Sequence, residues 1–250
     1  MHWLCHDRFH RMPPGATAGG IAVVIDVLRA STTIVTALAH GAALVLPRRS
    51  LEEARAAAAA RPGAVLGGER GGVRIEGFEL GNSPAEYTAD RVAGRPVVIT
   101  TTNGTAALAA CHEAVEVLVG AIVNRTAVTA TARRLAAERG CDAIHLVCAG
   151  TDGHVTGEDV LAAGAILDAA GGDAQLDEAA AAARERFRAL AAAGRGGLEG
   201  RIATAFRTCL GGENLIALGM ESDLPLAAAI DSLALVPRLD RRVGALVAAS

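Results

Sequence analysis

The stretch VVITTTNGTAAL, residues 97–108, places a short apolar run directly before a polar cluster and an alanine-rich segment. The run at 97–99 is typical of a buried strand, and the alanine-rich segment is typical of a helix. Three threonines, Asn103, Gly104 and Thr105 stand between them, which is more polar side chains than a helix cap requires. The stretch predicts a strand-to-helix turn that holds a ligand; an Asn-Gly turn without a ligand is the alternative.

Similar apolar runs alternate with helix-like segments through the first half of the chain. Strands are predicted at 21–25, 64–66, 97–99, 117–122 and 144–147, with a further candidate at 42–46. This alternation is typical of strands that helices cover on both faces. The sequence therefore predicts an α/β fold.

The second half gives fewer signals. A helix is predicted over 176–193, with glycine-rich loops at 171–172 and 194–200 and a last edge strand at 233–236. We divide the chain into an atypical N-terminal segment at 1–20, a domain at 21–239 and a C-terminal tail at 240–250.

Polar or small residues follow each of the five predicted strands. In chain order they are Asp26, then Glu69 and Arg70, the threonines, Asn124 and Arg125, and finally Cys148 to Gly150. Ligands of open α/β sheets bind just beyond the carboxyl ends of the strands. We expect the five ends to form one site.

The chain contains no lysine, so all 24 basic residues are arginines. This excludes Schiff-base enzymes, a pyridoxal-phosphate anchor and a Walker-type phosphate loop. An anionic ligand must therefore be held by arginine, backbone N–H groups, hydroxyls or a metal. The five cysteines form no CxxC pair, which argues against a disulfide framework and against a structural zinc site.

Charge and hydropathy narrow the range of partners. The chain has a formal charge of -3, and its basic residues form no stripe along the sequence. It contains only a few aromatic residues that could stack on bases: four Phe, one Trp and one Tyr. A nucleic-acid partner is therefore not expected. No apolar run approaches the roughly 18 residues of a membrane span. No signal peptide is recognised, and we expect a cytoplasmic protein without a membrane partner.

The stretch IDVLRASTT, residues 25–33, carries a carboxylate, an arginine and hydroxyls within one turn. Asp26 can ligate Mg²⁺, Arg29 can bind phosphate oxygens, and Ser31 and Thr32 can donate to an anion. The alternative is structural, with Asp26 or Ser31 as a helix cap and Arg29 in a surface ion pair.

Three further stretches contain candidate residues. Glu69 and Arg70, in GGERGG, form either a flexible loop that closes over an anion or a solvated turn. Glu158 and Asp159 precede a helix, where they act either as metal ligands or as partners of the helix dipole. Ser83 before Pro84 has the pattern of a helix N-cap.

Taken together and in this order, the motifs resemble the 2-phosphosulfolactate phosphatase family, the ComB-type enzymes. The similarity rests on IDVLRASTT, GGERGG followed by LGNSP, TTTNGT, VNRTA, CAGTDG with GED, and LGMESDLPLAAAIDSLALVP. It covers position 21 to about position 239. The resemblance implies a three-layer α/β/α fold with a mixed, largely parallel sheet, and Mg²⁺-dependent hydrolysis of 2-phospho-3-sulfolactate to 3-sulfolactate and phosphate.

The motifs and the resemblance together suggest roles for individual residues. Asp26, Arg29 and Glu69 are the catalytic candidates, and Asp26, Glu158 and Asp159 are the candidate Mg²⁺ ligands. The predicted substrate-binding residues are Ser31, Thr32, Arg70, Thr102, Asn103, Gly104, Thr105, Asn124, Arg125 and Gly150. Because DVL lacks the second aspartate of a DxD phosphatase, metal-activated water is favoured over an aspartyl-phosphate.

The expected partner is a small molecule that bears phosphate, sulfonate and carboxylate groups, which arginine side chains suit. Two alternatives stay open: a phosphatase for another small anionic phosphoester, and a non-catalytic module that binds a phosphorylated or sulfonated metabolite. The sequence leaves open a homo-oligomer and the pathway served, whether coenzyme M synthesis or another sulfonate route.

Overall fold

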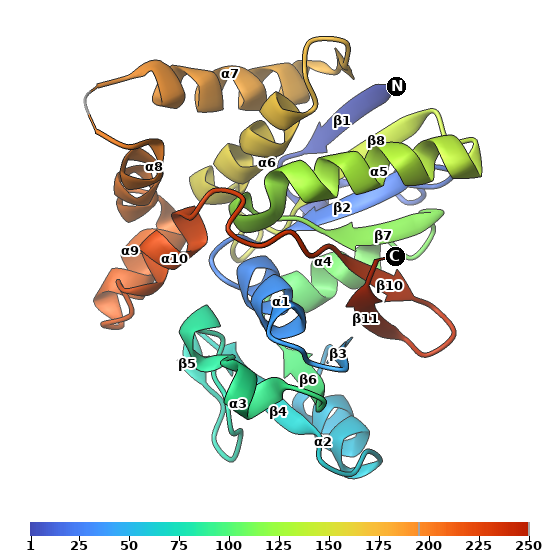
Figure 1. The fold of residues 1–250 in the computed structure, drawn as a ribbon, viewed down its shortest axis with the longest axis vertical. Helices are drawn as coiled ribbons and strands as arrows, with labels where there is room; N and C mark the ends of the chain where they lie inside the picture. The colour runs from blue at the N-terminus through green and yellow to red at the C-terminus, as the bar shows by residue number, and fades with distance from the viewer. Residues whose placement is uncertain (195, 250) are drawn as a thin grey trace.

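The computed structural model describes residues 1–194 and 196–249 (Figure 1). Position 195 of the predicted loop at 194–200 and position 250 of the predicted tail therefore lie outside the described residues. The strands are β1 (His2–His6), β2 (Ile21–Ile25), β3 (Leu44–Pro47), β4 (Val65–Arg70), β5 (Val73–Arg74), β6 (Pro96–Thr100), β7 (Glu116–Val119), β8 (Ala143–Cys148), β9 (Gln175–Leu176), β10 (Pro237–Asp240) and β11 (Ala245–Ala248).

Helices connect most of these strands and flank the sheet that they form (Figure 1). The α-helices are α1 (Ala30–Ala39), α2 (Leu51–Ala59), α3 (Ala89–Val92), α4 (Gly104–Ala110), α5 (Arg125–Arg139), α6 (Gly157–Ala169), α7 (Glu178–Ala192), α8 (Leu198–Arg207), α9 (Leu210–Ala217) and α10 (Asp223–Ala228). Three short 3₁₀ helices are η1 (Phe9–Arg11), η2 (Pro84–Glu86) and η3 (Ile122–Asn124).

The described strands form one sheet in the order β5-β4-β6-β3-β11-β10-β7-β2-β8-β1-β9. Neighbours pair in parallel within β4-β6-β3 and within β7-β2-β8-β1-β9. This mixed, largely parallel sheet with flanking helices confirms the predicted three-layer α/β/α fold.

The hairpin β10–β11 joins the two parallel groups. The pairings β7 with β10, β10 with β11, and β11 with β3 are all antiparallel. Three reversals in succession mean that the two parallel groups run in opposite senses along the sheet. The hairpin contacts the groups through two register pairs, Arg238 with Leu118 and Leu246 with Val45.

Strand β2 lies inside the larger parallel group, and its sequence IAVVI explains why. All five side chains are buried, as expected for a strand covered on both faces, and four of them are β-branched. Helices α5 and α6 pack against each other and against β2 and β8, while α4 also contacts β2. The strand β2, which Asp26 follows, is therefore held in place by helices that pack against it.

Most predicted strands are present, with shifted ends. The run predicted at 64–66 extends to Arg70, so Glu69 and Arg70 end β4 and are not part of a flexible loop. The run predicted at 117–122 ends at Val119, because the chain turns into η3. The candidate at 42–46 becomes β3, and the helix predicted at 176–193 is α7.

The predictions for the C-terminal region need correction. Residues 233–236 form no strand; the strand begins at Pro237, and β10 lies between β7 and β11 instead of at an edge. The predicted loop at 194–200 is too long, since α8 begins at Leu198.

The two terminal segments, 1–20 and 240–250, were separated from the central domain in the sequence analysis. Each contributes a strand, β1 and β11, to the same sheet as that domain.

A membrane span would need a long apolar helix. Within residues 1–194 and 196–249, none of the helices reaches the length and apolarity that crossing a bilayer requires.

Candidate functional site

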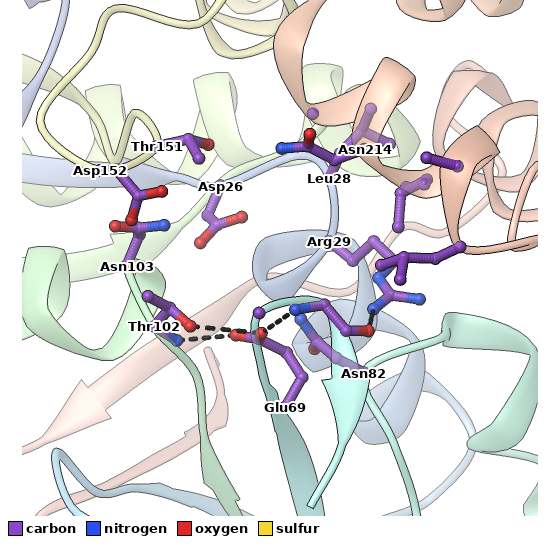
Figure 2. A pocket seen from close by; sticks show the side chains of 16 residues that line it. Asp26, Leu28, Arg29, Glu69, Asn82, Thr102, Asn103, Thr151, Asp152 and Asn214 are labelled. Carbon is purple, nitrogen blue, oxygen red and sulfur yellow. Dashed lines mark hydrogen bonds between the residues drawn. The ribbon is translucent and has the colours of Figure 1, made fainter.

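A cavity of about 360 Å³ lies where the carboxyl ends of β2, β4, β6 and β8 meet (Figure 2). Helix α9 completes its wall. Residues that follow four of the five predicted strand ends line it, among them Asp26, Glu69, Thr102, Asn103 and Thr151. The residues that follow β7 do not. The two parallel groups run in opposite senses, yet their carboxyl ends share this cavity.

Asp26 is the first residue after β2 and is partly exposed to the cavity. Its backbone N–H donates to Ser31 Oγ at 2.8 Å, and its carbonyl accepts from Ser31 N at 2.8 Å. Its Oδ1 accepts a long hydrogen bond of 3.3 Å from Ala30 N. A side chain at Gly104 would come within 2.7 Å of Asp26 Oδ2, so the glycine at the start of α4 makes room for this carboxylate. The turn thus presents Asp26 to the cavity.

Burial raises the pKa of Asp26 well above its usual value, and the carboxylates of Asp159, Glu69 and Glu158 raise it further. Burial also raises the pKa of Glu158 to about 7, with Asp159 adding to the shift, and that of Asp159 to about 6. Four acidic side chains therefore share one region of low dielectric constant. Such a cluster disfavours full ionisation and attracts a cation.

Glu158 and Asp159 lie behind the cavity wall, at the start of α6. Asp159 accepts from Val27 N at 2.8 Å and from Gly150 N at 3.0 Å, which joins the turns after β2 and β8. Glu158 Oε1 accepts from Gly211 N at 2.9 Å, at the start of α9. Neither residue lines the cavity. Their carboxylates hold three segments of the site together.

The raised pKa values predict how stability depends on pH in the metal-free protein. In the unfolded chain these carboxyls titrate near pH 4, but in the folded chain Glu158 and Asp159 titrate at about 7 and about 6. Between these values the folded state binds more protons, so the free energy of unfolding falls as the pH rises from about 4 to about 7. Urea titrations in chelator across this range measure the slope; a stability that rises with pH would contradict the prediction.

Arg29 precedes α1 and is buried, with 3% of its surface exposed. Its Nη1 donates to Asp223 Oδ2 at 2.8 Å and lies 2.9 Å from Met220 Sδ, and its Nη2 donates to Gly72 O at 2.7 Å. The peptide bond before it is cis. Arg29 also lines the cavity, so a fixed guanidinium and the Asp26 carboxylate face the same space.

The threonine run after β6 forms hydrogen bonds that hold the carboxyl end of β4 in place. Glu69 Oε1 accepts from Thr102 N at 2.7 Å, while its Oε2 accepts from Gly72 N at 2.7 Å and from Thr102 Oγ1 at 3.2 Å (Figure 2). Thr105 N donates to Thr101 Oγ1 at 3.2 Å, which satisfies an N–H group in the first turn of α4. Most of these polar groups therefore connect strand ends, and Thr102 and Asn103 also line the cavity.

Several predicted substrate-binding residues are not brought to the cavity. Ser31 holds the Asp26 turn, and Thr32 Oγ1 donates to Val27 O at 2.8 Å. Arg70 Nη2 donates to Thr100 Oγ1 at 2.8 Å. Gly104 adjoins Asp26, Thr105 N donates to Thr101 Oγ1 within the first turn of α4, and Gly150 N donates to Asp159. These residues surround or support the cavity and do not line it.

Asn124 and Arg125 lie away from the cavity, contrary to the prediction that all five strand ends meet. Asn124 is buried, and its Nδ2 donates to Val119 O and Leu235 O. Arg125 forms an ion pair with Asp231 at 3.1 Å, and its guanidinium lies over the Phe187 ring. Both residues hold the C-terminal segment against η3 and α5.

Sequence reasoning missed several residues of the site. Asn82 and Asp152 line the cavity, and so does Asn214 of α9. Asp223, which pairs with Arg29, also accepts from Ser83 Oγ at 2.5 Å. Ser83 is the N-cap of η2, with Pro84 after it, as predicted, while its hydroxyl contacts this acid. The motifs LGNSP, CAGTDG and LGMESDLP contain most of these residues, but nothing in the sequence alone shows that they meet.

The residues at the cavity suit Mg²⁺ in their chemistry. Asp26 and Asp152 offer carboxylate oxygens, the ligand type that Mg²⁺ prefers, and the acidic cluster favours a cation. In the described part of the chain, no three or more His, Cys, Asp or Glu residues form a group that could hold a metal ion. Mg²⁺ commonly binds through one or two carboxylates together with water and substrate phosphate, so this donor set fits the ion.

Comparisons with known proteins agree on one family. The model of the family described as 2-phosphosulpholactate phosphatase matches residues 8–242. A probable 2-phosphosulfolactate phosphatase of Symbiobacterium thermophilum is 42% identical over 230 residues, covering 90% of this chain and 93% of that protein. Proteins with the same name from Deinococcus radiodurans (46% over 222 residues; 88% and 87% covered) and Gloeobacter violaceus (41% over 219; 87% of each) are also similar.

Proposed function

The chain belongs to the 2-phosphosulpholactate phosphatase family, and on this premise we propose that it hydrolyses 2-phospho-3-sulfolactate to 3-sulfolactate and phosphate with Mg²⁺. Membership makes it a phosphoric monoester hydrolase. We further propose the identity of the substrate, the dependence on Mg²⁺ and a cytoplasmic location for the enzyme. The proposed substrate carries phosphate, sulfonate and carboxylate groups.

One observation carries the proposal: Asp26 and Arg29 face the same cavity. A carboxylate on a cavity wall can hold a cation, and a buried guanidinium can bind an anion. A binding site for a phosphate ester of a small organic acid requires both. The cavity volume of about 360 Å³ lies in the range of small-molecule sites.

Asp26 would hold Mg²⁺, with Asp152 as the second acidic residue at the cavity. When bound, the ion would neutralise charge on the phosphoryl oxygens. Glu158 and Asp159, which were predicted as ligands, act in this proposal from behind the wall. Their hydrogen bonds to Val27, Gly150 and Gly211 keep the Asp26 turn and α9 in place, and their charges make the region attractive to a cation.

Hydrolysis requires water to add to phosphorus while the bond from phosphorus to the C2 oxygen breaks, and the leaving oxygen takes up a proton. Negative charge spreads over the phosphoryl oxygens in the transition state. Arg29 has two N–H groups beyond those that contact Asp223, Gly72 and Met220, and can donate them to anionic groups of the substrate. The hydrogen bonds from Thr102 and Gly72 to Glu69 keep the wall next to Arg29 fixed, so that little reorganisation is required.

The direct test measures phosphate release from 2-phosphosulfolactate with Mg²⁺ and with chelator. Phospholactate and 3-phosphoglycerate, which lack the sulfonate, serve as controls. We expect release that requires Mg²⁺ and favours the sulfonated ester. Release from all three esters at equal rates would support a phosphatase activity but contradict the proposed preference for 2-phosphosulfolactate. Retained ligand binding without release under either condition would overturn the proposal in favour of a binding module.

A further inference from the structure

Asn82 is a cavity residue whose role in the fold is not apparent from its own contacts. It lies just before η2, is 5% exposed and lines the cavity. Its backbone carbonyl accepts from Thr33 Oγ1 at 2.7 Å. The next residue, Ser83, binds Asp223, which in turn pairs with Arg29. The Asn82 backbone is therefore fixed beside the Arg29 wall.

The side-chain amide of Asn82 is not satisfied by the protein. Its Oδ1 is buried and has no hydrogen-bond partner among the described residues. Its Nδ2 is not among the buried unpartnered atoms and donates to no described residue, so this group reaches the open space of the cavity. A buried amide without partners costs stability, and an apolar side chain of similar shape would avoid that cost.

Asn82 and Arg29 together offer hydrogen-bond donors to the cavity. The amide Nδ2 provides two N–H groups, and Arg29 retains two beyond its protein contacts. Figure 2 shows Arg29 and Asn82 on one side of the view and Asp26, Asn103 and Asp152 on the other. Glu69 also lines the cavity close to Arg29, but both of its oxygens accept hydrogen bonds, from Gly72 N and Thr102 N. Asp26 and Asp152 thus lie apart from the donors of Arg29 and Asn82, which suits a ligand with two separate anionic groups.

We infer that Asn82 determines specificity by donating to the sulfonate of the substrate beside Arg29, while the phosphate lies at the Asp26 side. This inference rests on the proposed function. The carboxylate of the substrate is attached to the carbon that bears the phosphate, whereas the sulfonate is attached to the next carbon and extends further. Its three oxygens can accept from an amide and a guanidinium together.

A site built to hydrogen-bond a substrate group discriminates strongly against an analogue without that group. The test compares kcat/KM for 2-phosphosulfolactate and phospholactate in wild type, Asn82→Leu and Asn82→Asp. We expect the ratio of the two values to fall about 10- to 100-fold in both variants, because kcat/KM for the sulfonated ester falls more than that for phospholactate. Asn82→Leu removes the unpartnered amide and keeps its size, so its Tm should not fall.

A second measurement does not depend on turnover. Titration calorimetry with 3-sulfolactate and with lactate, in chelator, reports the sulfonate site directly. We expect wild type to bind 3-sulfolactate more tightly than lactate, and Asn82→Asp, which keeps the size of Asn82 but repels an anion, to lose this preference.

The outcomes separate the inference from the proposed function. Equal losses of kcat/KM for both esters, or an unchanged preference for 3-sulfolactate in the variants, would assign Asn82 a structural role and overturn the inference. If wild type releases phosphate from neither ester, the proposed function fails, and the titration alone decides whether Asn82 forms a sulfonate site.

Discussion

Asp26→Asn is expected to lower kcat/KM for phosphate release about 10³-fold, a loss of about 4 kcal/mol of transition-state stabilisation. Asn has the same size and can keep the hydrogen bond from Ala30 N, so the turn after β2 should persist. The charge that faces the cavity is lost, and with it the proposed means of holding a cation. Steady-state assays at saturating Mg²⁺ measure the loss; a variant with more than about a tenth of wild-type kcat/KM would contradict it.

The same variant should gain stability when no metal is present. Asp26 shares its surroundings with Glu69, Glu158 and Asp159, and removing its charge relieves repulsion in the cluster. At pH 8 in chelator, we expect Asp26→Asn to melt at a higher temperature than wild type, and Mg²⁺ to raise the Tm of wild type only.

The mechanism can be tested separately. Trapping a phospho-aspartate on Asp26 during turnover would show covalent catalysis and contradict hydrolysis by metal-activated water.

Arg29→Lys is expected to lower kcat/KM about 10²- to 10³-fold. A lysine ammonium is one point of charge and cannot reach Asp223, the carbonyl of Gly72 and an anion in the cavity at once. Arg29→Met should also lower stability, because it leaves the buried Asp223 carboxylate, which is 2% exposed, without its cationic partner. Breaking a buried pair in this way costs about 3–5 kcal/mol in the free energy of unfolding.

A double variant separates the two effects. Arg29→Met with Asp223→Leu removes both charges, so much of the stability should return while activity stays low. Arg125→Lys is the matched control, because Arg125 also pairs with an aspartate but lies outside the cavity. Its kcat/KM should stay within about twofold of wild type. Equal losses in Arg29→Lys and Arg125→Lys would mean that Arg29 acts through the fold alone.

The sequence predicts β2, β4, β6, β7 and β8 because each contains a short, local apolar run, but it misses the parallel strand β1, which pairs with the distant strands β8 and β9. The run at 21–25 is fully buried, and each of the five runs corresponds to a strand. The hairpin β10–β11 is missed because its position depends on partners far away: Leu246 pairs with Val45, and Arg238 with Leu118. No local pattern encodes such a pairing.

The residues of the candidate site also differ in how well the sequence predicts them. Asp26, Glu69, Thr102 and Asn103 line the cavity as expected, because each lies at or close to the carboxyl end of a strand that the sequence predicts. Asn82 and Asp223 escape notice because their importance arises from contacts with distant segments, as between Asp223 and Arg29. Asn124 and Arg125 follow a strand as well, but η3 turns the chain away from the cavity there.

The hairpin that joins the two parallel groups also constrains the order of assembly during translation. Residues 237–248 leave the ribosome after both groups have been synthesised, and domains begin to fold as they emerge. Each parallel group can pair its own strands early, but Val45 must wait about 200 residues of synthesis for Leu246. The continuous sheet is therefore completed only late in synthesis, when the hairpin docks between two preformed halves.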